Sequence, residues 1–286
     1  MEGRVIIITG GSSGIGRALA AKFGEVGGKL VITGRKKDQL EHTATTLRNL
    51  GFTVLPVVAD ASVEADCAHV VDAAIKEFGR IDVLINNAGI SMRGLFEDLQ
   101  LDVFKKVMDV NFYGTVYTTK YALPHIIRSR GSIVGISSVN GKRATPARSA
   151  YSASKFAMTG FLESLRSEMI EHGVHVLTVC PGFTASNIRR AALTATGKIT
   201  GETTHDESHT MSAEEVAEHV YQAVVNRRRR DLLLTLQGKL AVWLNVFFPR
   251  WMDRKTLEFI RKEEERAGER QFKIRNSSTS YSKTPT

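Results

Sequence analysis

Residues 4–27 read RVIIITGGSSGIGRALAAKFGEVG. An apolar run of strand character opens this stretch, a glycine-rich turn follows it, and a segment of helical periodicity closes it. The same alternation of strand and helix recurs along the chain. Seven apolar runs are predicted to form strands: 4–9, 29–33, 53–58, 81–86, 132–136, 174–180 and 231–235. Because parallel strands need helical crossovers, the sequence predicts an α/β fold with a doubly wound, seven-stranded parallel sheet and helices on both faces.

The 286-residue chain is long enough for one large α/β domain with a tail. We expect that domain over residues 1–235, an amphipathic helical extension over 236–272, and a disordered polar tail over 273–286. No run of about 20 apolar residues is present, and strand character starts at residue 4. We therefore expect a cytoplasmic protein without a signal peptide or a membrane-spanning helix.

Positive charge is concentrated towards the C-terminus. The formal net charge is +9, and residues 227–286 contain 15 of the 39 Lys and Arg residues but only 7 of the 30 acidic residues. This segment has no recognised nucleic-acid-binding motif, so we expect no nucleic-acid partner. The two cysteines, Cys67 and Cys180, lie far apart in apolar surroundings and are expected to be free thiols in a reducing compartment.

The glycine-rich turn between the first strand and the first helix is a candidate phosphate site. Free backbone N–H groups at a helix start attract phosphate, and glycines let the chain turn tightly beside it. Its spacing differs from the common GxGxxG by two residues. A plain turn is the alternative, but the strand and helix on either side favour a dinucleotide. The expected contacts are Gly10, Ser12, Ser13, Gly14, Ile15 and Gly16.

The second strand ends at Thr33, Gly34 and Arg35, where an NAD-selective site would place an acidic residue for the ribose hydroxyls. Gly34 cannot bind the ribose hydroxyls in this way. Arg35 would instead form a charge-assisted contact with a 2′-phosphate, so the sequence predicts NADP, or NADPH, as the cofactor. The alternative is that Arg35 belongs to a solvated basic helix start.

A serine and a tyrosine–lysine pair follow two later predicted elements. Ser138 ends the strand at 132–136, and Tyr151 and Lys155 lie four residues apart on one face of the next helix. A nearby ammonium lowers the pKa of a phenol from about 10 towards working pH, so that the tyrosine can exchange a proton with a substrate oxygen. Taken alone, such a pair would more often be a surface pair.

The motifs together resemble the short-chain dehydrogenase/reductase family, whose members have a Rossmann fold. The resemblance covers about residues 3–235 and includes the family's usual thirteen-residue step from Ser138 to Tyr151. The matching motifs occur in the family's order: TGxxxGxG at residue 9, Asn86-Asn87-Ala88-Gly89, Asn111, Ser138, the YxxxK motif of Tyr151 and Lys155, and Pro181-Gly182.

The resemblance implies a catalytic role for four residues. Tyr151 would exchange the substrate proton, Ser138 would hydrogen-bond the substrate oxygen, and Lys155 would bind the ribose hydroxyls of the cofactor. Asn111 would hold a proton-relay water near the lysine.

The resemblance also extends the expected cofactor contacts. Tyr151 and Lys155 would touch the cofactor as well as the substrate. The remaining implied contacts are Asp60 near the adenine, Asn87, Ala88 and Gly89 along the ribose, and Pro181, Gly182, Thr184 and Ser186 near the carboxamide. Thr184 and Ser186 depart from the family's PGxVxT pattern, which leaves their contacts open. The alternative for Asn86 and Asn87 is that they only cap the end of a strand. Family members often form dimers or tetramers through the helices that contain Asn111 and Tyr151, so a homo-oligomer is expected.

A Thr- and Ala-rich stretch at about residues 185–211 is expected to be a mobile lid over a small-molecule substrate. His205 and His209 lie within it at a spacing that allows a metal site. Two histidines in a polar loop are more often solvated, so no metal is expected.

The extension at 236–272 combines an apolar helical face with basic residues. Leu240, Trp243, Leu244, Phe247 and Phe248 share that face. It would pack on the protein's own body or a partner subunit, or it would lie peripherally on an acidic membrane. Its loose likeness to extensions of family members that act on steroids and keto lipids suggests an apolar keto substrate.

The expected activity is hydride transfer between NADP(H) and a carbonyl or secondary alcohol, catalysed at Tyr151. The alternative is an NADP(H)-binding scaffold or sensor that uses its basic tail to reach a membrane or partner. Loss of the tyrosine or the lysine would favour that alternative, and the sequence retains both.

Overall fold

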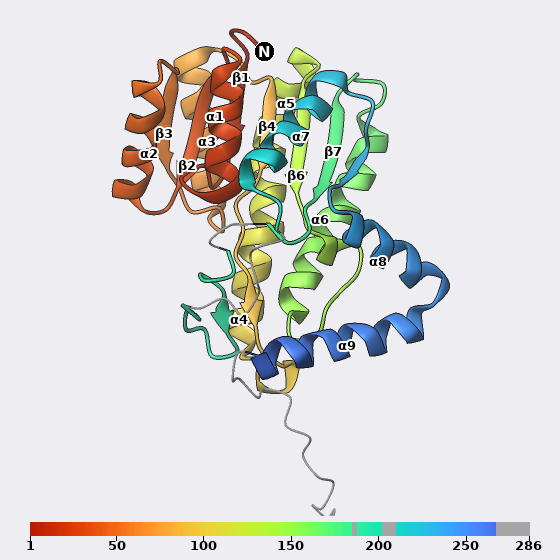
Figure 1. Cartoon of the computed structure of the whole chain (residues 1–286). Coiled ribbons are helices and arrows are strands. Elements are labelled where there is room, and N and C mark those ends of the chain that lie inside the picture. Colours follow the sequence, from red (N-terminus) through yellow and green to blue (C-terminus); the bar gives the residue numbers. More distant parts are fainter. Residues whose placement is uncertain (185–187, 202–209, 267–286) are drawn as a thin grey trace, which may run out of the picture.

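The computed structural model describes residues 1–184, 188–201 and 210–266. Its main sheet has seven parallel strands in the spatial order β3-β2-β1-β4-β6-β7-β9 (Figure 1). The strands are β1 (Val5–Ile8), β2 (Lys29–Gly34), β3 (Val54–Val58), β4 (Val83–Asn86), β6 (Ser132–Ile136), β7 (His175–Cys180) and β9 (Asp231–Leu233). Each lies within or overlaps one of the seven predicted runs. The order reverses beside β1, as in a Rossmann fold, so the predicted fold class is confirmed.

Helices cover both faces of the sheet because the strands are apolar on both sides. The strand side chains Ile6 and Ile8 pack into one core, whereas Val5 and Ile7 pack into the other. The first core is covered by α1 (Gly14–Glu25), α2 (Lys37–Asn49) and α7 (Ala213–Asn226). The second is covered by α3 (Glu64–Phe78), α5 (Gly114–Ser129) and α6 (Ser149–Glu168).

The boundaries of these helices follow local chemistry. At the N-terminus of α7 the side chain of Ser212 accepts a hydrogen bond from Glu215 N, and the Glu215 side chain accepts one from Ser212 N. At the end of α3, Gly79 adopts a left-handed conformation with φ of 74°. Between α4 (Leu101–Met108) and α5 the backbone forms a π-helical segment, η2 (Asp109–Tyr113). Such segments often occur at functional sites.

The expected lid is partly tied to the body of the protein. Its strand β8 (Leu193–Thr194) pairs in parallel with β5 (Met92–Arg93), and Ala195 O accepts a hydrogen bond from Gln100 N. Two short 3-10 helices, η1 (Phe96–Asp98) and η3 (Val139–Gly141), lie in the connections after β5 and β6. Over residues 188–201 the segment is thus joined to the body by a two-residue strand pair, and its predicted role as a mobile lid stays a prediction.

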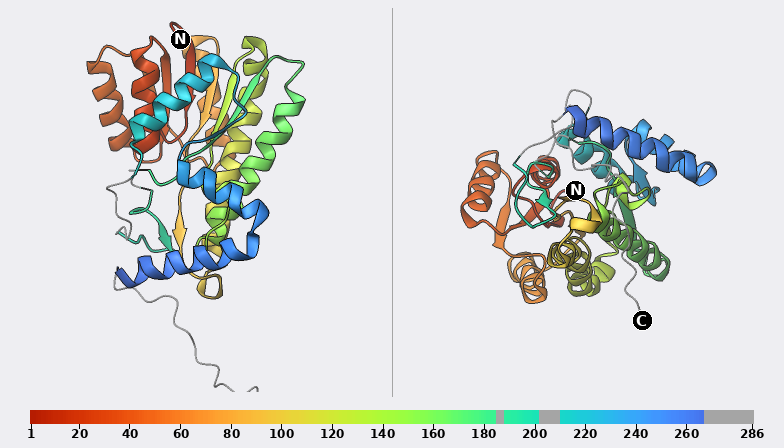
Figure 2. Two further views of the ribbon diagram at one scale, coloured as in Figure 1. Left: turned by 45° about the vertical axis from the view of Figure 1, so that its right-hand side comes forward. Right: turned by 90° about the horizontal axis from the view of Figure 1, so that it is seen from below.

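The C-terminal extension forms two helices, α8 (Leu236–Phe247) and α9 (Pro249–Arg266). Figures 1 and 2 show that α9 crosses the end of the molecule towards which the carboxyl ends of the parallel strands point. Met252 and Ile260 of α9 are buried, whereas Trp243 and Phe247 of α8 are 57% and 60% exposed. Over the described residues, no helix combines the length and apolar character needed to cross a membrane. The predicted tail at 273–286 lies outside the described residues.

Candidate active site

A cavity of about 760 Å³ opens at the carboxyl ends of the parallel strands. Its lining includes Ser138, Tyr151 and Lys155, which the sequence predicts to be catalytic, together with Asn87 and Gly89. Helix α9 closes one side with Met252, Phe259 and Ile260. The volume is typical of a small-molecule site. The strand ends therefore bring the β4, β6 and α6 motifs into one cavity, as the fold requires.

Tyr151 lies in the first turn of α6 and is only 8% exposed. Burial raises the pKa of its phenol above the ordinary value because the charged phenolate is poorly solvated. The Ser138 hydroxyl, through a hydrogen bond, and the Arg148 guanidinium, through its charge, act in the opposite direction and lower this pKa. The phenol is therefore protonated in its resting state and lies next to groups that stabilise its anion.

Lys155 lies one helical turn after Tyr151, as the spacing predicts. Its Nζ is 5.8 Å from the centre of the Tyr151 ring and donates a 2.8 Å hydrogen bond to Ile136 O. Burial lowers the pKa of this ammonium to about 8. The Tyr151–Lys155 spacing predicts that the ammonium lowers the pKa of the phenol, whereas in the structure the lowering comes from Ser138 and Arg148. Arg148 precedes Tyr151 by three residues, and this spacing is the sequence signal for its influence on the phenol.

Ser138 lies directly after β6 and caps the short helix η3. Its backbone is extended, with φ of −166°, and its hydroxyl accepts a 3.1 Å hydrogen bond from Asn140 N. That bond orients the hydroxyl oxygen while its proton stays available for donation. Ser138 and Tyr151 therefore form a pair that can hold one substrate oxygen between them.

Asn111 is fully buried in the π-helical segment and does not line the cavity. Its side-chain oxygen accepts a 2.8 Å hydrogen bond from Ile90 N, and its side-chain nitrogen donates to Ile90 O and Ser154 Oγ, both at 2.9 Å. These bonds connect the strand that ends in Asn86 to helix α6. The amide of Asn111 thus positions the site, and its predicted part in a proton relay stays a prediction.

The glycine-rich turn is closely packed against the end of β4. A Cβ on Gly16 would overlap Gly10 O and lie 2.6 Å from Asn87 Nδ2. Asn87 Nδ2 donates to Thr9 O at 2.9 Å and to Gly10 O at 3.2 Å, and Ala88 N donates to Thr9 Oγ1 at 3.0 Å. The turn and the Asn-Asn-Ala-Gly motif are therefore one structural unit.

This unit fits the phosphates and ribose of a dinucleotide. Helix α1 begins after Ser13, which makes no side-chain cap, so the first N–H groups of the helix have no side-chain acceptor at that position. Ile15 of the first turn lines the cavity. Gly89 keeps the space open, because a Cβ there would lie 3.2 Å from Asn111 Oδ1 and 3.5 Å from Lys155 Nζ. Ser12 and Gly14 lie in the same turn.

Arg35 and Asp60 meet at the ends of β2 and β3. Arg35 Nη1 is 3.8 Å from Asp60 Oδ2, and the two side chains are 52% and 33% exposed. The Asp60 carboxylate is further held by Ser62, whose backbone N and Oγ donate at 2.9 and 2.7 Å. The two residues predicted for the adenosine end of the cofactor thus lie together. In the strand order, β2 and β3 lie on one side of β1, and β6, which precedes the helix of Tyr151, lies on the other.

The segment after β7 forms another wall of the cavity with Pro181, Gly182 and Thr184. Pro181 O accepts a 3.0 Å hydrogen bond from Val139 N, and Thr184 Oγ1 donates to Gly182 O at 3.4 Å. Ser186 lies outside the described residues, as do His205 and His209. Among the described residues, no group of three His, Cys, Asp or Glu side chains could hold a metal ion. Cys67 and Cys180 are both free and buried.

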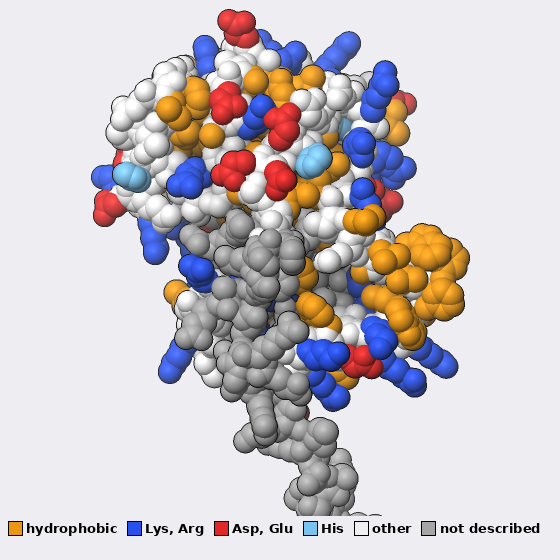
Figure 3. Space-filling view, in the orientation of Figure 1, with side chains coloured by type: hydrophobic (Ala, Val, Ile, Leu, Met, Phe, Trp, Pro, Cys, Tyr) orange, Lys and Arg blue, Asp and Glu red, His pale blue; other side chains and the backbone are white. Residues whose placement is uncertain are grey.

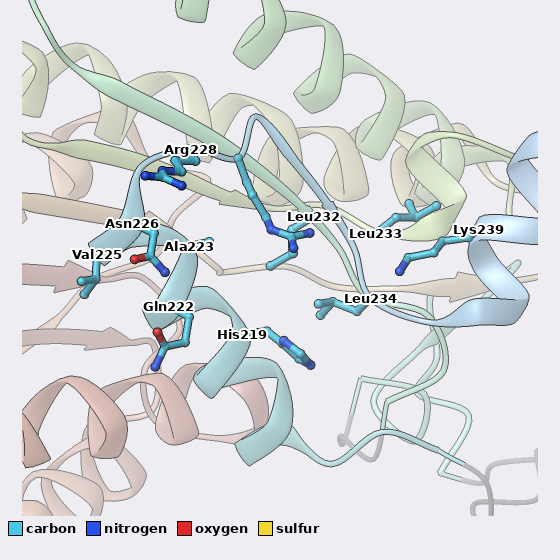
Figure 4. A pocket seen from close by; sticks show the side chains of 11 residues that line it. His219, Gln222, Ala223, Val225, Asn226, Arg228, Leu232, Leu233, Leu234 and Lys239 are labelled. Carbon is cyan, nitrogen blue, oxygen red and sulfur yellow. The ribbon is translucent and has the colours of Figure 1, made fainter.

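A second hollow lies between α7, β9 and the start of α8 (Figure 4). Its lining includes His219, Gln222 and Lys239 but none of the four predicted catalytic residues. The cavity beside Tyr151 is therefore the candidate active site.

Comparison with known proteins agrees with this geometry. The family described as short chain dehydrogenase matches residues 4–196, which is more than half of the chain. Dehydrogenase/reductase SDR family member 7B of Mus musculus is 39% identical over 270 residues, covering 92% of this chain and 83% of the mouse protein. Dehydrogenase/reductase SDR family protein 7-like of Anopheles gambiae is 37% identical over 267 residues, covering 90% of this chain and 84% of the mosquito protein.

A plant relative matches a shorter region. 11-beta-hydroxysteroid dehydrogenase-like 2 of Arabidopsis thaliana is 42% identical over 190 residues, covering 66% of this chain and 61% of the plant protein. The family uses nicotinamide cofactors, NAD or NADP, for which the glycine-rich turn is suited. The fold, the cavity and these relatives together establish that the chain belongs to the short-chain dehydrogenase/reductase (SDR) family of oxidoreductases.

Proposed function

We propose that the chain is an NADP(H)-dependent oxidoreductase that moves a hydride between nicotinamide and a carbonyl or secondary alcohol. The observation that carries the proposal is the position of Tyr151. It lies buried beside Ser138 and one helical turn before Lys155, in a cavity that the glycine-rich turn reaches through Ile15.

The reaction couples hydride transfer to proton transfer. When bound, NADPH supplies a hydride, with its two electrons, to the carbonyl carbon. Tyr151 donates its phenolic proton to the carbonyl oxygen, and Ser138 donates a hydrogen bond to the same oxygen as negative charge develops there. Lys155 would hold the ribose hydroxyls of the bound cofactor, and the charge of Arg148 stabilises the phenolate that is left. In the oxidation direction, the phenolate of Tyr151 accepts the alcohol proton.

The preference for NADP(H) rests on Arg35. Its guanidinium is half-exposed at the end of β2 and is held near Asp60, so it is oriented but still accessible to a 2′-phosphate. The carboxylate of Asp60 is engaged by Ser62 and by Arg35, which reduces its repulsion of a phosphate.

The proposed substrate is an apolar ketone such as a keto lipid or steroid. Most of the exposed surface inside the cavity is apolar, and Met252, Phe259 and Ile260 of α9 contribute to it. The name of the Arabidopsis relative, a hydroxysteroid dehydrogenase-like protein, is consistent with this class. The apolar lining includes Val139, Phe183, Ile188, Leu234, Met252, Phe259 and Ile260.

The proposed assembly is a homo-oligomer that uses the helices beside the site. Aromatic side chains are exposed there, with Tyr113, Tyr121 and Phe156 between 36% and 44% accessible. They lie on η2, α5 and α6, the elements that contain or follow Asn111 and Tyr151. Exposed aromatic residues on neighbouring helices are typical of subunit contacts.

The α8–α9 corner is proposed to dock peripherally on an anionic membrane. A projecting group of hydrophobic side chains covers this corner in Figure 3. Its exposed members are Leu240, Trp243, Val246, Phe247, Phe248 and Trp251. Basic side chains flank it at Lys239, Arg250 and Arg254. Exposed aromatic residues next to basic residues match the interface of an acidic bilayer.

The membrane contact is tested by sedimentation of the full chain with vesicles. Wild type should bind vesicles that contain phosphatidylserine and not pure phosphatidylcholine vesicles, and Trp243→Glu with Phe247→Glu should abolish the binding. If wild type is a dimer that does not bind vesicles and the variant is a monomer, the corner would instead be a contact with a second copy of the chain.

The activity is tested by following NADPH oxidation with a panel of keto lipids and ketosteroids. Tyr151→Phe should abolish turnover while NADPH binding persists, because the ring stays and only the transferable proton is lost. Undiminished turnover in this variant would contradict the mechanism. An NADPH-binding chain that turns over no ketone or alcohol would favour the scaffold alternative.

A further inference from the structure

The cavity is apolar, yet it is lined by several cations. Besides Lys155, four basic residues contribute to its wall, whereas Glu215 is the only acidic residue among the described lining residues. Glu215 is already engaged in the N-terminal cap of α7 with Ser212. The four additional cations are Arg143, Arg148, Arg189 and Lys255. A neutral ketone offers no negative charge to this cationic wall.

Arg143 and Lys255 both form ion pairs, and the Arg143 side chain is the less exposed of the two. It lies between Ser138 and Tyr151 in sequence, and its side chain is 12% exposed. Its Nη1 donates to the neighbouring Ala144 O, and its Nη2 donates to Asp253 Oδ1 at 2.8 Å and to Thr256 Oγ1 at 3.4 Å. Its Nε is buried and has no hydrogen-bond partner among the described residues.

The ion pair with Asp253 compensates this burial only in part. Asp253 is 69% exposed and does not line the cavity, so its charge is largely screened by water. The Nε atom is enclosed by protein atoms, so a ligand in the cavity would meet the guanidinium at the remaining N–H of Nη1. A guanidinium whose charge is only partly compensated is stabilised by an anion beside it. A carboxylate or a phosphate accepts a charge-assisted hydrogen bond from such a guanidinium, and it could displace the long 3.4 Å bond to Thr256 Oγ1 to gain a second.

Resting on the proposed function, we propose that the substrate is an acidic amphiphile, whose carboxylate or phosphate binds Arg143 while its apolar part fills the cavity beside Tyr151. Lys255 of α9 also lines the cavity, but its ammonium pairs with Glu258 at 2.9 Å, so Arg143 is the main cation for the anion. Arg143 is thus a specificity-determining residue, and the ketone of the substrate is oriented from its acidic end.

A purely structural role of Arg143 makes a different prediction. In that case the guanidinium would only tether α9 through Asp253 and Thr256, and breaking the tether from either side would have the same effect. As an anion site, Arg143 does not need Asp253. Removing that carboxylate would even leave the guanidinium more available.

The test uses decanoate, decyl phosphate and decanol as probes of the full chain in the presence of NADPH. Their dissociation constants are measured by calorimetry, which does not depend on turnover. The two acids should bind wild type roughly ten- to hundred-fold more tightly than decanol, as expected for a charge-assisted contact. Arg143→Gln should remove this difference, while Asp253→Asn should preserve or enlarge it. The ratio of decanoate to decyl phosphate binding identifies which anion the site prefers.

Unchanged NADPH binding in each variant shows that the variant is folded. Arg143→Lys keeps the charge but loses the planar guanidinium, so it should give an intermediate difference between the binding of the acids and of decanol. Equal binding of all three probes to wild type would overturn the proposal, and so would equal losses in Arg143→Gln and Asp253→Asn. If acids bind through Arg143 but no acidic ketone is reduced, the proposed function fails while the anion site stands.

Discussion

Lys155 Nζ donates a 2.8 Å hydrogen bond to Ile136 O, which ties helix α6 to the carboxyl end of β6. Both residues line the active-site cavity, and Lys155 is 2% exposed. The bond fixes the ammonium beside the Tyr151 ring, but burial makes the charge costly and lowers its pKa to about 8 from 10.5. The protein thus keeps an unfavourable buried charge at the position where the proposed chemistry needs one.

The first prediction concerns Lys155→Met and stability against pH. Between pH 8 and 10.5 the unfolded chain keeps the proton on Lys155 while the folded chain has released it, so this group makes wild type more stable as pH rises. The stability of wild type relative to the variant should therefore rise across this window, by at most about 3 kcal/mol. Urea unfolding at pH 7.5, 9 and 10.5 measures the difference.

Lys76→Met is the control for this measurement because Lys76 is exposed near the end of α3. Its stability difference from wild type should show no comparable rise over the same pH window. A Lys155→Met difference that stays flat would mean that the ammonium is not desolvated.

The second prediction concerns Arg148, whose charge lowers the pKa of Tyr151. Arg148→Gln should raise this pKa, because the phenolate loses a stabilising cation. The low-pH limb of alcohol oxidation, which requires the phenolate, should then move to higher pH. The pH profile of kcat/KM measures the shift, and Arg148→Lys should restore most of it. A profile identical to wild type would assign the limb to another group.

The third prediction concerns the packing of the glycine-rich turn. Gly16→Ala would force a Cβ into Gly10 O and Asn87, so it should cost about 1–3 kcal/mol of stability and weaken NADPH binding. Gly160→Ala is the matched control. Gly160 lies in the interior of the α6 sequence, and a Cβ there would meet nothing within 4 Å. This control should stabilise the protein by about 0.5–1 kcal/mol. Thermal unfolding and NADPH titration of both variants check this contrast.

Much of the fold could be predicted because each strand of the main sheet is a short apolar run between helical segments. The predicted run at 132–136 coincides with β6, and the run at 29–33 ends one residue before β2 does. The small sheet of β5 and β8 could not be predicted. Each of its strands has two residues, too few for any periodicity, and their pairing depends on a contact about 100 residues apart in sequence.

The chemistry of the site was also partly predictable. Tyr151 and Lys155 belong to one helix, so their spacing alone places them together. The position of α9 could not be deduced in this way, because it depends on contacts such as Arg143 with Asp253, 110 residues away. Arg143 and Arg148 look like ordinary solvated charges in sequence, and only the folded chain places them on the cavity wall.

The measurement that most directly tests the account is a titration of the full chain with NADPH and with NADH, followed by nicotinamide fluorescence. Wild type should bind NADPH at least roughly ten-fold more tightly, and Arg35→Asp should reverse the preference, because it replaces a partner of the 2′-phosphate with a repelling charge. Lys37→Asp, which makes the same charge change at the start of α2, should keep the NADPH preference. Equal or tighter binding of NADH by wild type would contradict the role assigned to Arg35 and with it the NADP(H)-dependent function.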